Sequence, residues 1–222
     1  MDIFFSGCAL IFLAPLLIPI SLVLRLTGEG EIFFIQQRVG RGGKYFGLYK
    51  FATMLKNSPS LGTGTVTVKD DPRVLPVGKF LRKTKVNELP QLLNILLGDM
   101  SIVGPRPQTQ RCFDGFPKIS QSEIIKVRPG LSGIGSIIFR GEEEMMHASM
   151  NPDHFYDCVI MPYKGKLEEW YVANQELRTY FASIFLTAWV VMFSRSQLPW
   201  RLFSQLPEPP SELAELVNFP NA

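Results

Sequence analysis

The hydrophobic pattern of the chain begins with a segment that is apolar on every side. Ile3 to Leu26 contains one charged residue, Arg25, and is long enough to cross a hydrocarbon core of about 30 Å as a helix. A surface helix of a globular domain would show a polar face, so the uniform pattern favours a membrane location. No basic region precedes the segment and no small-residue cleavage site follows it, which is not the pattern of a cleaved signal peptide.

Two prolines leave the path of this segment open. Pro15 and Pro19 each remove a backbone donor and clash with the preceding turn. A break at Pro15 would return the second half to the side from which it entered, whereas a tolerated proline would leave a spanning helix. Basic residues such as Arg38 and Arg41 outnumber acids just after the segment, which marks the cytoplasmic side of a membrane. We therefore place residues from 27 onward at the cytoplasmic face of a bacterial inner membrane.

The region beyond residue 30 contains several local patterns. Residues 31–54 predict two short strands around a glycine-rich turn. Residues 57–70 are rich in Gly, Ser and Thr, which is typical of a surface loop. Residues 121–140 predict a turn-rich loop followed by a strand, and residues 163–180 predict a polar helix. The apolar run 181–193 is too short to span a bilayer but suits a helix lying in the membrane interface.

A clear helical repeat begins at Glu88. Its apolar positions recur at i, i+3, i+4 and i+7, namely Leu89, Leu92, Leu93 and Leu96. Pro90 is tolerated only in the first turn, where its missing donor costs little, so Asn87 is expected at or near the N-cap. Gly98 is expected to end the helix.

Composition limits the classes of function. The 222 residues are 46% hydrophobic and 19% charged with a net charge of +3, which suits one domain with attachments. The basic residues are not interleaved with aromatic ones, so nucleic-acid binding is not expected. The three cysteines, Cys8, Cys112 and Cys158, lie far apart without a CxxC or Cys/His cluster, which supports neither a disulfide framework nor a zinc site.

Short motifs of defined spacing occur in order along the chain. They are KFxxM at Lys50–Met54, DPR at Asp71–Arg73, LRKT at Leu81–Thr84, ELPQLxN at Glu88–Asn94, GDMSxVGPRP at Gly98–Pro107 and RPGLSG at Arg128–Gly133. Through them the chain, from Asp2 to about Phe193, resembles the bacterial sugar transferases. These are monotopic phosphoglycosyltransferases that start the assembly of O-antigen, capsule, exopolysaccharide and glycoprotein glycans.

The resemblance implies an activity, a cofactor and a topology. The activity is transfer of a phosphosugar from a UDP-sugar to a polyprenyl phosphate, usually undecaprenyl phosphate, with release of UMP and assistance from Mg²⁺. The N-terminal helix is expected to break at Pro15 and re-enter the cytoplasmic leaflet. The expected fold is α/β of the α+β type: a re-entrant membrane helix at residues 1–26, a small cytoplasmic catalytic domain with interfacial amphipathic helices at 27–193, and a peripheral tail at 194–222.

The chain departs from the family at the catalytic dyad. Family members use an Asp–Glu pair, in which the Asp attacks the β-phosphate to form a covalent phosphosugar intermediate and the Glu helps to hold the metal. Here the pair is Asn87 and Glu88. A carboxylate can attack phosphorus and later leave, whereas a neutral amide is a poor nucleophile. Because Asn and Asp cap helices about equally well, Asn87 should preserve the structure while removing the covalent step.

Three functions remain open. An active enzyme would need direct attack of polyprenyl phosphate on the donor, or a substitute carboxylate such as Asp71. A non-catalytic homologue would bind the lipid phosphate or the UDP-sugar within a glycan-assembly complex. A membrane-anchored domain without a ligand would have little use for phosphate-binding residues. We therefore favour the enzyme.

The expected site residues follow from their chemistry. Glu88 is the first candidate for a Mg²⁺ ligand and Asp71 the second, although an acid at a helix start also suits the helix dipole. Arg106 stands between two prolines and offers a bidentate fork for phosphate. Lys50 can meet a pyrophosphate as a point charge. Two further phosphate candidates complete the set: Arg82 and Arg140.

The expected partners follow from the same reaction. They are a UDP-sugar, a polyprenyl phosphate, inner-membrane lipid and downstream glycosyltransferases, with a second copy of the chain as a candidate partner in a homodimer and no nucleic acid. Three smaller departures from the family accompany Asn87. Ser136 stands where many members have Gln, Tyr180 where an Asp is common, and Glu169 in place of an Asp near the matched Tyr171.

Overall fold

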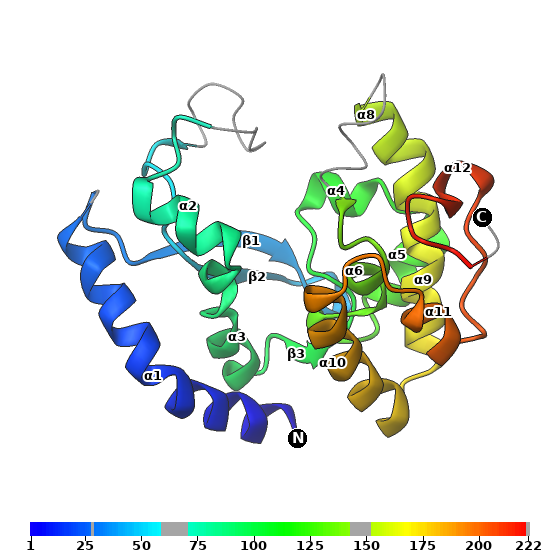
Figure 1. The fold of residues 1–222 in the computed structure, drawn as a ribbon, viewed down its shortest axis with the longest axis horizontal. Helices are drawn as coiled ribbons and strands as arrows, with labels where there is room; N and C mark the ends of the chain where they lie inside the picture. Colours follow the sequence, from blue (N-terminus) through cyan, green and yellow to red (C-terminus); the bar gives the residue numbers. More distant parts are fainter. Residues whose placement is uncertain (28, 59–70, 143–151, 221–222) are drawn as a thin grey trace. The chain divides into compact units, whose positions relative to one another are not determined.

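The fold combines many helices with small sheets, as the sequence predicts. The structure is a computed structural model that describes residues 1–27, 29–58, 71–142 and 152–220 (Figure 1). The chain forms two compact units, the first of Met1–Gln37 and Gly47–Gly98 and the second of Arg38–Phe46 and Asp99–Ala222. Most of the loop predicted at residues 57–70 lies outside the described residues.

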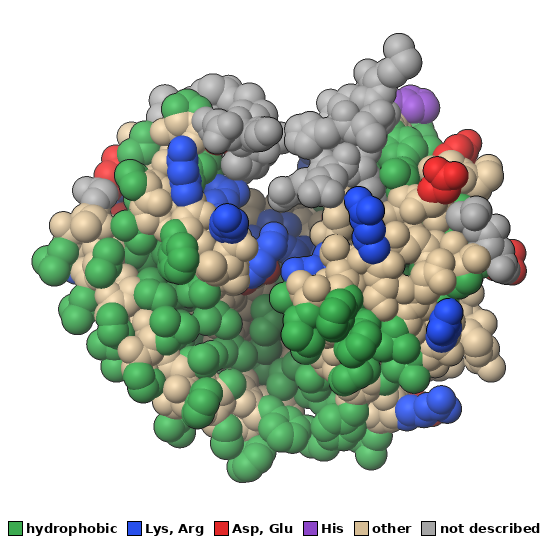
Figure 2. All heavy atoms as spheres, viewed as in Figure 1, with side chains coloured by type: hydrophobic (Ala, Val, Ile, Leu, Met, Phe, Trp, Pro, Cys, Tyr) green, Lys and Arg blue, Asp and Glu red, His purple; other side chains and the backbone are tan. Residues whose placement is uncertain are grey.

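The first unit begins with the apolar helix α1, Asp2–Leu26. Within the described part of the chain, it is the one helix long and apolar enough to cross a membrane. Only Ser6 and Leu24 of this helix are buried, and Figure 2 shows hydrophobic side chains gathered over its surface. The helix runs unbroken through both prolines, so the predicted break at Pro15 is absent. The ribbon curves instead (Figure 1), because each proline removes a single hydrogen bond while the neighbouring bonds persist.

The C-terminal end of α1 is anchored in the core of the first unit. Leu24 forms a buried cluster with Phe51 and Leu81, and Leu17 and Ile20 pack against that cluster. Phe51 ends strand β2, Tyr45–Phe51, and Leu81 lies on helix α2, Pro76–Lys83. The apolar helix is therefore attached to the unit by burial at its C-terminal end and by packing against helix α3, Gln91–Leu97, while many of its other side chains are exposed.

The predicted hairpin is confirmed. Strand β1, Phe33–Val39, pairs with β2, and the 3₁₀ turn η1, Arg41–Gly43, joins them. Gly42 and Gly43 have φ angles of 68° and 72°. Glycine adopts this left-handed conformation without the steric cost that a Cβ would add, so the turn explains the glycine-rich sequence.

Asn94 ties β2 to helix α3, Gln91–Leu97. Its side-chain oxygen accepts a hydrogen bond from the N–H of Tyr49 at 2.9 Å, and its amide nitrogen donates to the carbonyl of Gly47 at 2.8 Å. Asn94 is fully buried, so these two bonds satisfy a polar group that would otherwise be costly inside the core. The helix ends at Gly98, which has a φ of 89°, as the sequence predicts.

Pro90 changes how this helix begins. An α-helix would direct the N–H of residue 90 to the carbonyl of Val86, and proline has no N–H. The N–H of Leu89 bonds to that carbonyl instead, at 3.1 Å, which winds the 3₁₀ turn η3, Val86–Glu88. Asn87, expected at or near the N-cap, lies inside this turn and makes no capping bond, and the N-cap of the helix is Pro90.

The second unit is built around a short parallel pair of strands. Strand β3, Ser101–Val103, pairs with β4, Gly130–Ser132. The named helices that surround the pair are α4 (Gln110–Asp114), α5 (Lys118–Ile124), α6 (Ile134–Ile138), α8 (Pro152–Phe155), the π-helix η4 (Tyr156–Ile160), α9 (Met161–Ala173), α10 (Leu177–Met192), α11 (Leu198–Leu202) and α12 (Ser211–Ala214). The parallel pairing brings the motifs GDMSxVGPRP and RPGLSG next to each other.

Helix α6 replaces the strand that the β-branched run after residue 133 predicted. Ile134, Ile137 and Ile138 are all buried. Their spacing of i, i+3 and i+4 lies on one face of a helix, whereas a strand would turn adjacent residues to opposite faces. Burial of that single face therefore explains why this run forms a helix and not a strand.

The polar helix predicted at residues 163–180 is divided in two. Helix α9 ends at Ala173, and α10 begins at Leu177 and continues through the apolar run. Phe181, Phe185 and Val191 of α10 are exposed, so this helix presents apolar side chains outside the core.

The tail from residue 194, expected to be peripheral, contributes to the core of the second unit. Trp200, Phe203, Leu206, Leu213 and Val217 belong to the same buried cluster as residues of α6, α9 and α10. The indole N–H of Trp200 donates to the carbonyl of Val217 at 3.0 Å, which links the two ends of the tail. Most of the prolines and acids that made the tail look peripheral lie between two of these anchors, Leu206 and Leu213.

A substitution in the tail tests this packing. Leu213→Ala removes a completely buried side chain and should lower the free energy of unfolding by about 2–5 kcal/mol. Denaturant titration of the detergent-solubilised protein measures the change. The matched control is Leu177→Ala on the exposed start of α10, which should change stability by less than about 0.5 kcal/mol. Equal effects of the two variants would contradict a tail packed into the core.

Candidate active site

Lys50 and Glu88 lie together in the first unit. The Nζ atom of Lys50, on β2, is 3.7 Å from Oε1 of Glu88, at the end of η3, and the two side chains are 19% and 18% exposed. A pair that is mostly shielded from water but still reachable can exchange its internal contact for a phosphate and a cation. The predicted phosphate ligand and the predicted metal ligand are therefore neighbours.

A tight turn connects Arg82, a predicted phosphate ligand, to the segment that carries Glu88. Helix α2 ends at Lys83, and the N–H of Lys85 bonds to the carbonyl of Arg82 at 3.1 Å. Lys85 has a φ of 60°, a left-handed conformation that is costly for a residue with a Cβ. Its carbonyl then accepts the N–H of Glu88 at 3.1 Å. Strain of this kind is often retained at functional sites, where it fixes the direction of the following side chains.

Asn87, which occupies the position of the family's nucleophile, is 9% exposed. Its side-chain oxygen Oδ1 is buried and makes no hydrogen bond to any described residue. A buried acceptor without a donor costs about 1–3 kcal/mol. Local stability therefore does not explain the amide at this position, and its oxygen is available to a ligand.

Asp71 is occupied by an ion pair. Its two carboxylate oxygens accept hydrogen bonds from Nε and Nη2 of Arg73 at 2.9 and 2.6 Å, and both side chains are buried. Arg73 also donates from Nη1 to the carbonyl of Ser58 at 2.8 Å. The DPR motif thus joins the two ends of the segment between Ser58 and Asp71. With both oxygens engaged, Asp71 is better suited to this structural contact than to the predicted role of metal ligand or substitute nucleophile.

The donor set available to a metal is small. No group of three or more His, Cys, Asp or Glu residues that could hold an ion occurs in the described ranges. Glu88 supplies one carboxylate and the adjacent Asn87 one uncommitted oxygen. Such a set fits Mg²⁺, which often takes one or two protein ligands and completes its shell with substrate phosphates and water.

The Arg106 loop of the second unit, Gly104–Pro107, is held backbone to backbone against the RPGLSG motif. The N–H of Gly104 donates to the carbonyl of Ser132, and the N–H of Gly130 donates to the carbonyl of Pro105, each at 2.8 Å. A Cβ at Gly104, Gly130 or Gly133 would meet backbone atoms of the opposite segment. The glycines in the two motifs are therefore required by close approach of the chains.

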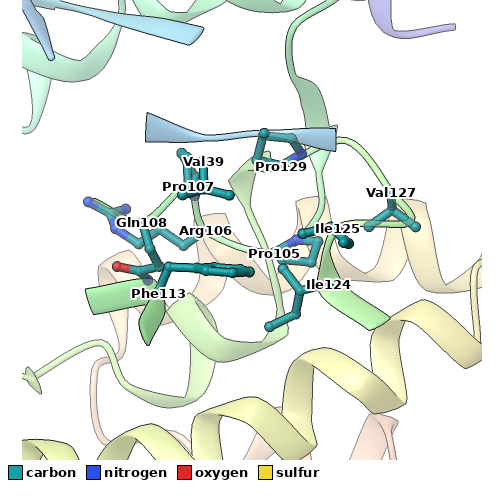
Figure 3. Close-up of a pocket in the computed structure, with 11 residues that line it drawn as sticks. Val39, Pro105, Arg106, Pro107, Gln108, Phe113, Ile124, Ile125, Val127 and Pro129 are labelled. Atoms are coloured by element: carbon teal, nitrogen blue, oxygen red, sulfur yellow. The ribbon is translucent and has the colours of Figure 1, made fainter. Parts of the chain in front are cut away.

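A small pocket lies behind the Arg106 loop (Figure 3). Pro107 and Pro129 face Phe113 and Ile124 across it. Its volume of about 10 Å³ matches roughly one water molecule, so it does not admit a nucleotide base. The pocket is apolar packing around the loop, and the chemistry of the loop resides in the Arg106 side chain.

Glu168 of α9 is a site residue that the sequence did not indicate. It is 1% exposed, and its carboxylate accepts a hydrogen bond from the backbone N–H of Arg106. Burial raises its pKa to about 7, against the opposing effects of the nearby Lys164 and of that hydrogen bond. The spacing of Lys164 and Glu168, one helical turn apart, was the available signal.

The remaining predicted residues of the second unit lie elsewhere. Arg140 is exposed just beyond α6. Glu169, which stands in place of a family Asp, accepts a hydrogen bond from the hydroxyl of Ser120, whereas its neighbour Glu168 is buried. Ser136 has a buried hydroxyl without a hydrogen-bond partner among the described residues. None of these observations adds a second phosphate ligand beside Arg106.

These features define a protein with an apolar helix long enough to cross a membrane and cationic sites suited to phosphate. A sequence model described as bacterial sugar transferase matches residues 1–194, and the chain belongs to this family. A UDP-N-acetylgalactosamine–undecaprenyl-phosphate N-acetylgalactosaminephosphotransferase of Aeromonas hydrophila is 34% identical over 160 residues, 70% of this chain and 38% of the relative. A UDP-glucose:undecaprenyl-phosphate glucose-1-phosphate transferase of Klebsiella pneumoniae is 37% identical over 150 residues, 65% of this chain and 32% of the relative.

Relatives of different length share the same region. The exopolysaccharide production protein PSS of Rhizobium leguminosarum bv. phaseoli is 47% identical over 143 residues, which are 61% of this chain and 70% of that protein. The chain therefore spans about a third of the two transferases and more than two thirds of the PSS protein.

The Asp71–Arg73 pair gives a stability test of its structural role. Arg73→Ala removes the guanidinium that pairs with the buried Asp71 carboxylate and should lower the free energy of unfolding by about 3–5 kcal/mol. The control is Lys126→Ala, which breaks the exposed pair with Glu123 and should cost at most about 1 kcal/mol. Denaturant titration compares the two. A small effect of Arg73→Ala would instead restore Asp71 as a candidate metal ligand.

Proposed function

We propose that the chain transfers a sugar-1-phosphate from a UDP-sugar to undecaprenyl phosphate and releases UMP, as the first step in assembly of a surface polysaccharide or glycoconjugate. The observation that carries this proposal is the Lys50–Glu88 pair within the matched family region. The transferases of A. hydrophila and K. pneumoniae, whose names specify this reaction, support it. The acceptor is a lipid, which accords with an exposed apolar helix at the start of the chain.

Each residue has a role that its chemistry permits. Lys50 offsets negative charge on the donor pyrophosphate, and Arg106 grips a phosphate through its guanidinium fork. Glu88, with the oxygen of Asn87 beside it, would hold Mg²⁺. The ion would supply positive charge that screens the phosphates and so lowers the repulsion between two anionic substrates. Arg82 adds a further cation from the end of α2.

Asn87 favours a direct displacement. A phosphate oxygen of the lipid attacks the β-phosphorus of the UDP-sugar, and the bond between that phosphorus and the oxygen bridging to the α-phosphate breaks. UMP leaves with this oxygen, and the product is a lipid pyrophosphate that carries the sugar. Positioning and charge neutralisation provide most of the catalysis in phosphoryl transfer, so a protein nucleophile is not required. Both substrates must then be bound at once.

The same amide supports one alternative, a non-catalytic homologue that binds UDP-sugar or lipid phosphate within a glycan-assembly complex. Asn87 retains an oxygen for a ligand while lacking the nucleophile. The two functions differ in whether any donor is consumed.

For topology, we propose that α1 enters and leaves the same leaflet of the inner membrane, with the remaining chain at the cytoplasmic face. The curvature of α1 around its two prolines and the basic residues that follow it support this arrangement.

The order of substrate requirement tests the reaction. Wild-type protein incubated with a panel of UDP-glucose, UDP-galactose and UDP-N-acetylgalactosamine should release UMP only when undecaprenyl phosphate is present. Asn87→Asp should release UMP with donor alone and show a phosphosugar adduct by intact-protein mass spectrometry. Glu88→Gln serves as the inactive control in both backgrounds.

The outcomes separate the two functions. An inert wild type beside an active Asn87→Asp variant would favour the binding homologue. A phosphosugar adduct on the wild type with donor alone would contradict direct displacement.

Accessibility of the chain ends tests the topology. Single cysteines placed near Met1 and near Thr27, in a background lacking Cys8, Cys112 and Cys158, should both react with a membrane-impermeant maleimide only after the inner membrane is opened. The reason is that a re-entrant helix keeps both of its ends on the cytoplasmic side. Labelling of the N-terminal site in intact spheroplasts would establish a spanning helix instead.

A further inference from the structure

The Arg106 loop is held by hydrogen bonds to its backbone. The N–H of Gly104 donates to the carbonyl of Ser132, and the N–H of Gly130 donates to the carbonyl of Pro105, each at 2.8 Å. The N–H of Arg106 donates to the carboxylate of Glu168. Two further bonds come from the first hairpin: Arg38 Nη1 donates to the carbonyl of Pro107 at 3.1 Å, and Val39 N–H donates to the carbonyl of Gln108 at 2.9 Å. Because Pro105 and Pro107 have no N–H, Arg106 supplies the one backbone donor of the Pro-Arg-Pro sequence. Glu168 provides the one carboxylate acceptor in this set.

Glu168 is held tightly in this position. It lies on α9 beneath the loop, and a Cβ at Gly135 of α6 would collide with its Oε1. Its Oε2 is buried without a hydrogen-bond partner in the described part of the chain. A fully buried carboxyl with one unsatisfied oxygen is costly, so packing or stability alone gives no reason for an acid here.

The charged groups around Glu168 are few. Lys164, on the same helix, favours the ionised carboxylate, and its Nζ donates to both oxygens of Glu142 at 2.8 and 2.9 Å. Helix α6 brings no titratable residue to α9. On α5, Ser120 bonds to Glu169 and Lys118 to Gln121, and just beyond α5 Lys126 bonds to Glu123. In η4, Asp157 lies near Gly115, and the hydroxyl of Tyr156 interacts with Cys112. Lys164 and Arg106 are therefore the groups that bear on Glu168.

We propose that Glu168 is a positioning residue for the donor phosphate: it fixes the backbone of Arg106 between the two prolines and thereby sets the direction in which the guanidinium meets phosphate. This inference rests on the proposed function and takes the phosphate that Arg106 grips to be that of the donor. An ionised Glu168 accepts a stronger hydrogen bond than a neutral group, so the loop is held most firmly when the carboxyl is charged. Glu168 acts through Arg106 and does not itself touch the substrate.

Binding of UDP to the intact protein with Mg²⁺, measured by calorimetry, tests the proposal without requiring turnover. Glu168→Gln preserves the shape and an acceptor oxygen but removes the charge, and should weaken UDP binding about fivefold at about pH 8. At about pH 6 the wild-type carboxyl is mostly protonated, so the ratio of the two dissociation constants should approach one. Taking the ratio at each pH cancels the titration of UDP itself.

Two further variants locate the effect. Glu169→Gln, next to Glu168 on α9 but bonded to Ser120, is the matched control and should leave UDP binding unchanged at both pH values. In an Arg106→Ala background, Glu168→Gln should add no further loss, because the residue acts only through that arginine. Gly135→Ala, whose methyl group presses on Oε1 of Glu168, should weaken binding in the wild type and not in the Arg106→Ala protein.

Thermal stability gives an independent measure of the charge. The folded protein binds the Glu168 proton more tightly than the unfolded chain does, because the pKa rises from 4.5 to about 7 on folding. The stabilising contribution is thus complete below the unfolded pKa and is lost as the pH rises through about 7. The Tm of the wild type should therefore fall relative to that of Glu168→Gln as the pH rises from about 5 to about 8.

The possible failures are distinguishable. A wild type that binds no UDP would overturn the proposed function and this inference with it. UDP binding that is normal in the wild type and equal in Glu168→Gln at about pH 8 would overturn only the positioning role, as would an equal loss in the Arg106→Ala background.

Discussion

Prolines that remove backbone donors shape each segment on which the site depends. Pro90 leaves the carbonyl of Val86 without its α-helical partner, and the resulting 3₁₀ turn carries Asn87 and presents Glu88 beside Lys50. Around Arg106, two prolines reduce the backbone donors to one, which a buried carboxylate accepts. In α1, Pro15 and Pro19 leave a continuous but curved helix. The missing N–H of proline thus gives a tight turn, a rigid loop or a bend, according to what replaces the lost hydrogen bond.

Local pattern predicted the elements whose cause is local. The hairpin and the helix that ends at Gly98 follow from glycine conformation and leucine spacing, and both are present. The run from Ile134 to Ile138 has strand-forming residues, but burial of one face makes it a helix, a decision taken by partners distant in sequence. The apolar anchors of the tail were likewise hidden among prolines and acids, because a composition average does not show which residues are buried.

The candidate site likewise combines residues that local motifs predicted with contacts that only packing determines. Motifs identified Lys50, Glu88 and Arg106, and the structure pairs the first two at 3.7 Å. They could not reveal that Asp71 is neutralised by Arg73 two residues away, nor that Glu168 lies beneath a loop more than 60 residues earlier in the chain. Such contacts depend on how segments pack, and charge alone gives no sign of them. Buried groups left unsatisfied, such as Oδ1 of Asn87, are features that stability does not explain and function can.

The buried contact of Arg73 with Asp71 and Ser58 has a consequence for how the chain can vary. Arg73 holds Ser58 and Asp71 next to each other, although they are far apart in the sequence. Among descendants of the chain, variation at Arg73 or Asp71 should therefore be limited, because a change at either would release the contacts that hold Ser58 and Asp71 together.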